Sequence, residues 1–231
     1  MTLAGLPSTR ELLTHMVEAR LPPAARAWWS TSSAATTPFD EAAFLVQFAG
    51  ASRLVGRAPL SCTADEIAAL TRAGIGWPVA ASADELARVT LLLGAPLDAE
   101  GQAALAAEAY RRGDNRERQA VLRALPLLPF VPALLTLAVE ACRTNVVPLF
   151  AAIACENPFP SERFPELNFN QMVLKAVFVG LALERVLDLE RRLTPELTRV
   201  AEDYAKERIA AGRSVPADLR LLGVKVLHEA I

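Results

Sequence analysis

The chain has 231 residues, with 24 basic and 26 acidic side chains and a formal charge of -2. At roughly 100–200 residues per domain, this length allows one domain or two tightly fused ones. Hydrophobic residues make up 52% of the sequence, which excludes disorder as the main state because disordered chains lack the apolar material for a core. The near-neutral charge argues against a general nucleic-acid binder, which needs a basic surface. Aromatic residues, at 6%, are too few for a base-stacking platform.

Histidine and cysteine are too scattered to predict a metal site or a disulfide framework. The two histidines, His15 and His228, lie near opposite ends, and neither belongs to a Glu-x-x-His or a His-Glu-x-x-His motif. The three cysteines, Cys62, Cys142 and Cys155, form no Cys-x-x-Cys pair. The sequence also lacks a P-loop and a nucleophile elbow. We therefore expect free thiols in a reducing compartment, no metal and no cofactor.

No segment of the sequence predicts membrane insertion or export. Residues 1–7 lack the basic start and the long apolar stretch of a signal peptide. The longest uncharged apolar stretch runs from Ala124 to Val139, but three prolines interrupt it and it falls short of the roughly 20 residues that a span needs. We expect a cytoplasmic protein without a transmembrane segment.

Helix-favouring residues dominate the N-terminal half, and capping boxes mark several helix starts. At Ser8, the hydroxyl can accept from the Glu11 amide while the Glu11 carboxylate reaches back, which opens a helix to Ala19. Two later helices of similar sequence are expected to be antiparallel and joined through Trp77-Pro78. Further starts of this kind predict helices over residues 67–73, 86–93, 98–112 and 114–125.

Prolines and glycines divide the C-terminal half. Because Pro158 and Pro160 interrupt the helical pattern, we predict an ordered loop over residues 157–168. The loosest stretch of the whole chain is residues 30–38, which is rich in Ser and Thr and is expected to form a mobile loop. Helices are predicted over residues 132–143, 146–156, 170–179, 184–193, 195–211 and 216–229.

These elements predict an all-α fold of about ten to twelve helices. Many short helices with short connections favour either an α-helical hairpin array, which is solenoid-like, or an irregular bundle. We expect a single domain over residues 1–231, with two lobes of about 1–125 and 126–231 as the open alternative.

The most specific segment of the sequence runs from Cys155 to Met172. It contains three Asn, one Gln and three Pro among four aromatic or Met residues. One interpretation is a rigid loop whose amides satisfy buried backbone groups. The other is an aromatic pocket with a polar edge. The candidate binding residues of such a pocket are Arg143, Asn145, Asn157, Asn168, Asn170, Gln171 and Lys175.

Several blocks in this region resemble the signature of EboA-like proteins. They are Arg143-Thr144-Asn145, Ala152-Ile153-Ala154, Glu156 to Pro160, Asn170 to Ala176 and Phe178 to Arg185. The resemblance implies a family that is encoded in a bacterial gene cluster of secondary metabolism, the ebo cluster. That cluster is linked to moving a metabolite or its precursor toward the periplasm. It implies no established reaction, so it marks signature positions and not catalytic ones.

Three functional hypotheses follow. The first is a non-catalytic helical adaptor or carrier that assists the biosynthesis or export of a secondary metabolite or its precursor. Its partner would be a hydrophobic or aromatic small molecule, or another protein of the ebo cluster.

The second hypothesis is a cofactor-free enzyme of the isomerase or cyclase type. It would use Lys175, Glu166, Glu156 or Arg143 for acid–base or electrostatic work. The third, a peripheral membrane module, is weakly supported because the arginines near residues 191–199 are interspersed with acids.

Overall fold

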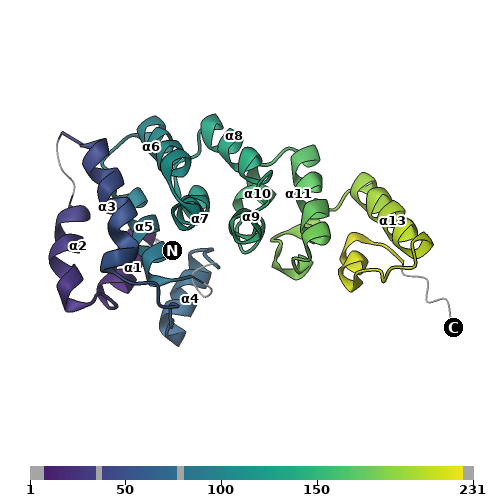
Figure 1. Cartoon of the computed structure of the whole chain (residues 1–231), viewed down its shortest axis with the longest axis horizontal. Helices are drawn as coiled ribbons and strands as arrows, with labels where there is room; N and C mark the ends of the chain where they lie inside the picture. Colours follow the sequence, from purple (N-terminus) through teal and green to yellow (C-terminus); the bar gives the residue numbers. More distant parts are fainter. Residues whose placement is uncertain (1–7, 35–37, 77–80, 226–231) are drawn as a thin grey trace, which may run out of the picture. The chain divides into compact units, whose positions relative to one another are not determined.

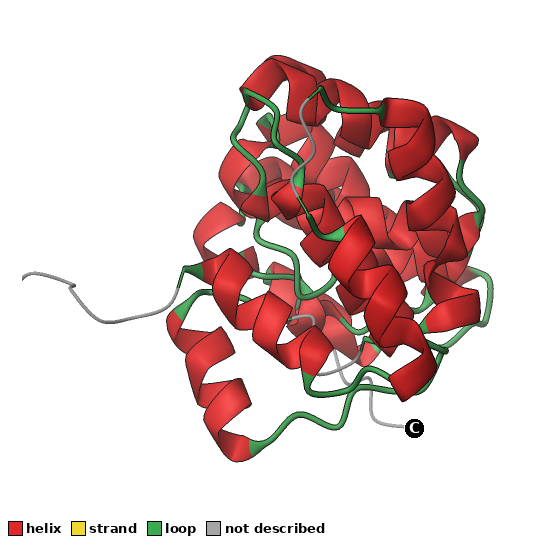
Figure 2. Cartoon of the chain, turned by 90° about the vertical axis from the view of Figure 1, so that its left-hand side faces the viewer, coloured by secondary structure: helices red, strands yellow, loops and turns green. Residues whose placement is uncertain are grey.

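The computed structural model describes residues 8–34, 38–76 and 81–225 (Figure 1). Over these residues the chain is all-α, as predicted. It forms thirteen α-helices and four 3-10 helices, and its one strand-like feature is an isolated bridge between Pro59 and Ser82. Figure 2 shows only helices and loops in the described part of the chain. The helices outnumber the expected ten to twelve because some, such as α12 with 4 residues, are a single turn.

The chain forms two compact units, which divide between Glu140 and Ala141 at the end of α8 (Pro132–Ala141). We call them the N-terminal unit and the C-terminal unit, and each is described by itself. The expectation of one domain with two lobes that meet near residue 125 stays a prediction.

Helix α5 (Ala83–Gly94) is the centre of the N-terminal unit, and most of its 12 residues are buried. A helix that is buried on nearly all sides belongs to the middle of a bundle. Four helices pack around it, so this unit is an irregular bundle and not a stack of helix pairs. These helices are α1 (Thr9–Glu18), α3 (Glu41–Leu54), α6 (Ala99–Arg112) and α7 (Asn115–Ala124).

The predicted capping boxes form at the starts of α1, α4 (Ala64–Arg72) and α7. At Ser8, for example, the hydroxyl accepts from the Glu11 amide at 3.2 Å and the Ser8 amide donates to the Glu11 carboxylate at 2.7 Å. The start of α5 differs, because the hydroxyl of Ser82 donates to the Asp84 carboxylate at 2.6 Å and does not cap the helix.

Two helices of the N-terminal unit lie where no helix is predicted. They are α2 (Arg26–Ser32), preceded by a 3-10 turn over Pro23–Ala25, and α3. The prediction of a mobile loop over residues 30–38 is therefore wrong at its start, because residues 30–32 form the last turn of α2. Residues 35–37 of the predicted loop lie outside the described residues. The expected loop at Trp77-Pro78 also lies outside them. A 3-10 turn, Leu125–Leu127, leads toward α8.

The C-terminal unit corrects the predicted loop over residues 157–168. This stretch contains α10 (Phe159–Arg163) and the start of α11 (Glu166–Val179), after α9 (Val147–Ala154). The prolines taken as breaks stand in or just before the first turn of these helices, where a proline lacks only an amide that would be unpaired anyway.

The end of the chain also differs from the prediction. The helix predicted over 184–193 is a 3-10 turn (Leu183–Arg185) and the short α12 (Leu189–Arg192), separated by Asp188 in the left-handed region at φ 55°. After α13 (Pro195–Ala210), the helix predicted from residue 216 is a 3-10 helix, Ala217–Leu222. Gly223 ends it at φ 79°, and residues 226–231 lie outside the described residues.

Candidate functional site

Asn157, a predicted site residue, is buried and binds backbone at both ends of its amide. Its Nδ2 donates to the carbonyl of Ala152 at 3.0 Å, and its Oδ1 accepts from the amide of Phe159 at 3.0 Å. It is 2% exposed. The side chain thus ties the end of α9 to the start of α10, which is the structural interpretation of this segment.

Lys175 joins α11 to the turn that precedes α9. Its Nζ donates to the carbonyls of Cys142 and Thr144, both at 2.6 Å, and lies 4.9 Å from the centre of the Phe150 ring. Burial raises the pKa of the Cys142 thiol to about 12, although the nearby Lys175 lowers it. The ammonium is therefore engaged with backbone, and the thiol beside it stays protonated.

Asn170 ties α11 to the start of α13. Its Nδ2 donates to the hydroxyl of Thr194 at 3.2 Å, and that hydroxyl accepts from the Leu197 amide and so caps α13. The Oδ1 of Asn170 is buried and has no hydrogen-bond partner among the described residues.

The remaining predicted site residues point outward. Arg143, Asn145 and Gln171 are exposed and Asn168 is half-buried, and none of these side chains bonds to a described residue. Lys175 holds the backbone of residues 142 and 144. Arg143 and Asn145 therefore lie beside the place where this turn meets α11. The predicted set thus divides into three side chains that bond within the fold and four that bond to no described residue.

The groups considered for acid–base chemistry are not gathered at one reaction centre. The Glu156 carboxylate pairs with Arg185 through two hydrogen bonds, at 2.6 and 2.9 Å, and Lys175 is held by carbonyls. Glu166 lies exposed in the first turn of α11. The hollows described next are lined by other residues.

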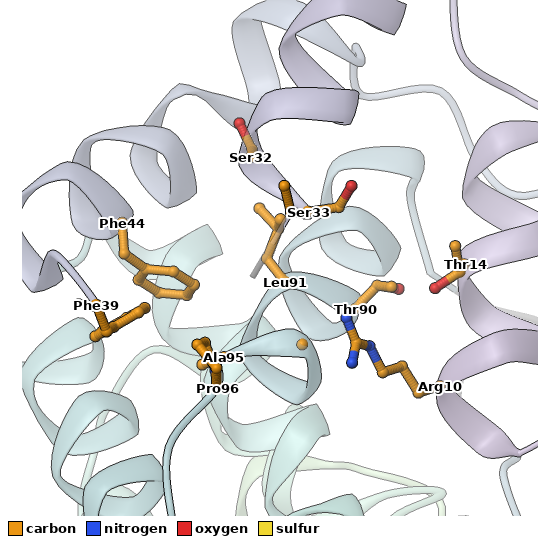
Figure 3. A pocket seen from close by; sticks show the side chains of 12 residues that line it. Arg10, Thr14, Ser32, Ser33, Phe39, Phe44, Thr90, Leu91, Ala95 and Pro96 are labelled. Atoms are coloured by element: carbon orange, nitrogen blue, oxygen red, sulfur yellow. The ribbon is translucent and has the colours of Figure 1, made fainter. Parts of the chain in front are cut away.

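A narrow pocket of about 30 Å³ lies in the N-terminal unit, with room for about two water molecules (Figure 3). We call it the α1–α5 pocket. Its walls come from α1, the end of α2, the start of α3 and the end of α5. It is lined by Arg10, Thr14, Ser32, Ser33, Ala34, Phe39, Phe44, Thr90, Leu91, Gly94, Ala95 and Pro96.

Arg10 stands on one side of the pocket, beside the C-terminal end of α5 (Figure 3). A Cβ atom on Gly94 would lie 3.1 Å from a guanidinium nitrogen, so a larger residue here would push the guanidinium aside by a few tenths of an ångström. The negative end of the helix dipole favours a cation here. Arg10 forms no hydrogen bond or ion pair with a described residue, so its donors stay available.

The polar wall beside Arg10 offers acceptors. The hydroxyls of Ser33 and Thr90 donate to the carbonyls of Trp29 and Leu86, at 2.6 and 2.9 Å. Since each hydroxyl has one proton and that proton is in use, its oxygen can only accept from a ligand.

The opposite side of the pocket is aromatic. The rings of Phe39 and Phe44 lie 5.7 Å apart at 50°, and Phe44 stacks in turn on the buried Phe48. In Figure 3 these two lining rings face Arg10 across Leu91. The pocket is therefore polarised, with a cation at one end and an aromatic pair at the other.

Two larger hollows lie nearby in the same unit. One of about 390 Å³ runs along α1 and shares Arg10 and Thr14 with the α1–α5 pocket. The other, of about 450 Å³, contains the Arg20–Glu66 pair, whose two hydrogen bonds of 2.6 and 2.7 Å engage both groups with each other. The first hollow extends the pocket, whereas the charged groups among the described lining residues of the second are paired with each other.

Comparison with known families identifies the family of this chain. The family described as "Metabolite traffic protein EboA" matches residues 9–223. The chain belongs to the EboA family. The resemblance seen over residues 142–186 is thus confirmed and extends through the N-terminal half. No curated protein and no solved structure matches the chain.

The EboA match covers both the signature segment and the lining of the α1–α5 pocket. Sequence reasoning missed this pocket, although residues 30–38 gave a partial signal, since a Ser/Thr-rich run that leads into Phe39 supplies two of its hydroxyls. None of the described helices combines the length and the apolar character needed to cross a membrane.

Proposed function

We propose that this member of the EboA family is a non-catalytic carrier that holds a small metabolite in the α1–α5 pocket. The family description as metabolite traffic proteins supports the handling of a small molecule. The observation that carries the proposal is the available guanidinium of Arg10, placed opposite the Phe39–Phe44 pair. Such a combination of apolar surface with few fixed polar groups is typical of ligand sites. The cargo would be a secondary metabolite or its precursor.

A carrier suits the pocket better than an enzyme does. The described lining residues of the narrow pocket itself include no carboxylate, histidine, cysteine or lysine, which are the usual groups for proton transfer and nucleophilic attack. Glu11, His15 and Glu18 line only the hollow along α1. Arg10 offers N–H donors and no acceptor, so it can bind an anion. The lining can therefore hold and orient a molecule without reacting with it.

The exposed signature residues support a second role, contact with a protein partner. We propose that Arg143, Asn145 and Gln171 form part of a surface that binds another protein of the ebo cluster. They are exposed, they lie near the Lys175 junction, and their polar groups bond to no described residue. Asn157 and Lys175, in contrast, support this surface from within the fold.

The carrier role is tested by native mass spectrometry of protein purified from its own host with the neighbouring genes expressed. Thr14→Phe adds a large side chain to the pocket wall, and Thr71→Phe is the matched control on exposed α4. We expect a small-molecule adduct on the wild type and on Thr71→Phe, and its loss from Thr14→Phe. An adduct that persists on folded Thr14→Phe would contradict the pocket assignment, and a wild type without adduct would contradict the carrier role.

A further inference from the structure

We infer that the ligand of the α1–α5 pocket is an aromatic monocarboxylic acid that also carries a hydroxyl or amine donor. This inference rests on the proposed function and adds the chemical class of the cargo. It follows from three features of the lining: a single charge, an aromatic pair, and the hydroxyls of Ser33 and Thr90, whose protons are already donated within the fold.

The charge of the lining selects an anion. Arg10 is the one charged residue among the described lining residues, so a bound anion meets one positive charge and no negative charge there. A single guanidinium balances a monoanion, whereas a phosphate dianion would keep an excess charge. The planar fork of donors on Arg10 also matches the two oxygens of a carboxylate.

The position of Arg10 prepares it for this contact. The C-terminal end of α5 favours a cation, and the missing side chain at Gly94 leaves space for the guanidinium. The protein thus holds Arg10 without a carboxylate partner among the described residues, and a ligand can fill that place.

The aromatic and hydroxyl walls select the rest of the molecule. A flat ring can pack on Phe39 and Phe44, whose tilted arrangement leaves edge and face contacts open. An O–H or N–H group on the ligand can donate to the oxygens of Ser33 and Thr90, which have already used their own protons.

The free space of about 30 Å³ takes only one functional group of such a molecule. The remainder must displace side chains or extend into the hollow along α1, which shares Arg10 and Thr14. That hollow is also lined by Glu11 and Glu18, so the carboxylate of the ligand must stay in the narrow pocket and only its uncharged part can extend. Arg10 is exposed and Phe39 is half-buried, so both can move without opening the core. Side-chain rearrangement of this kind is common on binding.

Three probes test the inference on the full chain by ligand-observed NMR titration. 4-Hydroxybenzoate has all three features, 4-hydroxybenzamide replaces the carboxylate with a neutral amide, and 4-hydroxycyclohexanecarboxylate replaces the aromatic ring with a saturated one. We expect the first to bind about tenfold or more tightly than either of the others. The amide loses the charge of the hydrogen bonds to Arg10, and the saturated acid loses the aromatic contacts with Phe39 and Phe44.

Variants assign the preference to Arg10. In Arg10→Gln the advantage of the acid over the amide should vanish, and it should persist in Arg72→Gln, an exposed arginine of α4 outside the pocket. Gly94→Ala should weaken the acid more than the amide, since its Cβ forces the guanidinium to shift by a few tenths of an ångström. Circular dichroism confirms that each variant is folded.

The two proposals fail in different ways. If the acid and the amide bind equally to the wild type, or if Arg10→Gln keeps the preference for the acid, the inference is overturned while the carrier role stands. If no probe binds at millimolar concentration and Thr14→Phe retains the host adduct, the pocket assignment itself is overturned.

Discussion

Replacing Asp84 with asparagine is expected to lower the free energy of unfolding of the N-terminal unit by about 3–5 kcal/mol, the usual effect of breaking a buried ion pair from one side. Asp84 is fully buried at the start of α5 and pairs with Arg88 at 2.7 Å, which is itself 1% exposed. Ser52 and Ser82 each donate to its carboxylate at 2.6 Å, and Arg116 of α7 donates twice, at 2.7 and 3.1 Å.

The size of this effect follows from what the asparagine leaves behind. Arg88 also donates to the carbonyl of Phe48 and to Ser52, so it cannot turn out to solvent when its counter-charge is lost. Among the described residues, the other acid paired with Arg88 is Glu117, at 3.8 Å. The new amide would also present N–H groups to donors. Since domains are stable by about 5–15 kcal/mol in total, the loss is a large fraction.

Tryptophan fluorescence in urea measures this change in the N-terminal unit alone, because all three tryptophans, Trp28, Trp29 and Trp77, precede residue 140. Asp65→Asn is the matched control, because Asp65 is exposed in the first turn of α4 and surface changes of this kind usually alter stability by less than about 0.5 kcal/mol. An Asp84→Asn protein as stable as the control would refute the reasoning.

The pH dependence gives a second check. Burial by itself raises the pKa of Asp84, but the hydrogen bonds from Arg116, Ser52 and Ser82 outweigh it and hold this pKa well below its usual range. A depressed pKa adds stability that is complete above the unfolded value of about 3.9 and is lost as the pH falls toward the folded value. The stability difference between wild type and Asp84→Asn should therefore shrink when the pH is lowered from 5 to 3.

Three further predictions concern the C-terminal unit. Asn157→Ala should lower the free energy of unfolding by about 1–3 kcal/mol, because it leaves a buried carbonyl and a buried amide without their bonds, and urea unfolding followed by circular dichroism measures this. Lys175→Met should speed amide hydrogen exchange in residues 142–147, since the ammonium no longer holds the two carbonyls of this turn. With a pKa of about 12, Cys142 should react with iodoacetamide at pH 8 more than a hundredfold more slowly in the native protein than in denaturant, as followed by mass spectrometry.

The sequence predicts the helices well where the signal is local. The capping boxes at Ser8, Thr63 and Asp114 form because all their partners lie within three residues. The prediction fails at Ser82, whose hydroxyl is taken by Asp84 in a network that also includes α3 and α7. No pattern of neighbouring residues predicts that Asp84 takes the Ser82 hydroxyl away from the helix cap. Helix α3 did have a local start signal, since Asp40 accepts from the Ala43 amide, and this signal was missed.

The candidate site is less predictable because its contacts are distant in sequence. The unusual composition of residues 155–172 marks a special segment, but it does not show that the partners of Lys175 are backbone carbonyls more than thirty residues earlier. The α1–α5 pocket combines α1 with residues near 32–44 and 90–96. Arg10 is ordinary in composition, and only its place beside Gly94 makes it a candidate.

This division of the signature changes how its mutants should be interpreted. Loss of metabolite production in Lys175→Ala or Asn157→Ala would not identify a binding residue, because both side chains hold the fold together. A triple alanine variant at Arg143, Asn145 and Gln171 separates the two effects. Surface changes of this kind usually alter stability by less than about 0.5 kcal/mol each, so the variant should unfold like the wild type and bind 4-hydroxybenzoate equally well. If it nevertheless no longer supports metabolite production in the host, the defect lies in partner binding. If production is unchanged, the exposed signature residues do not form the proposed partner surface.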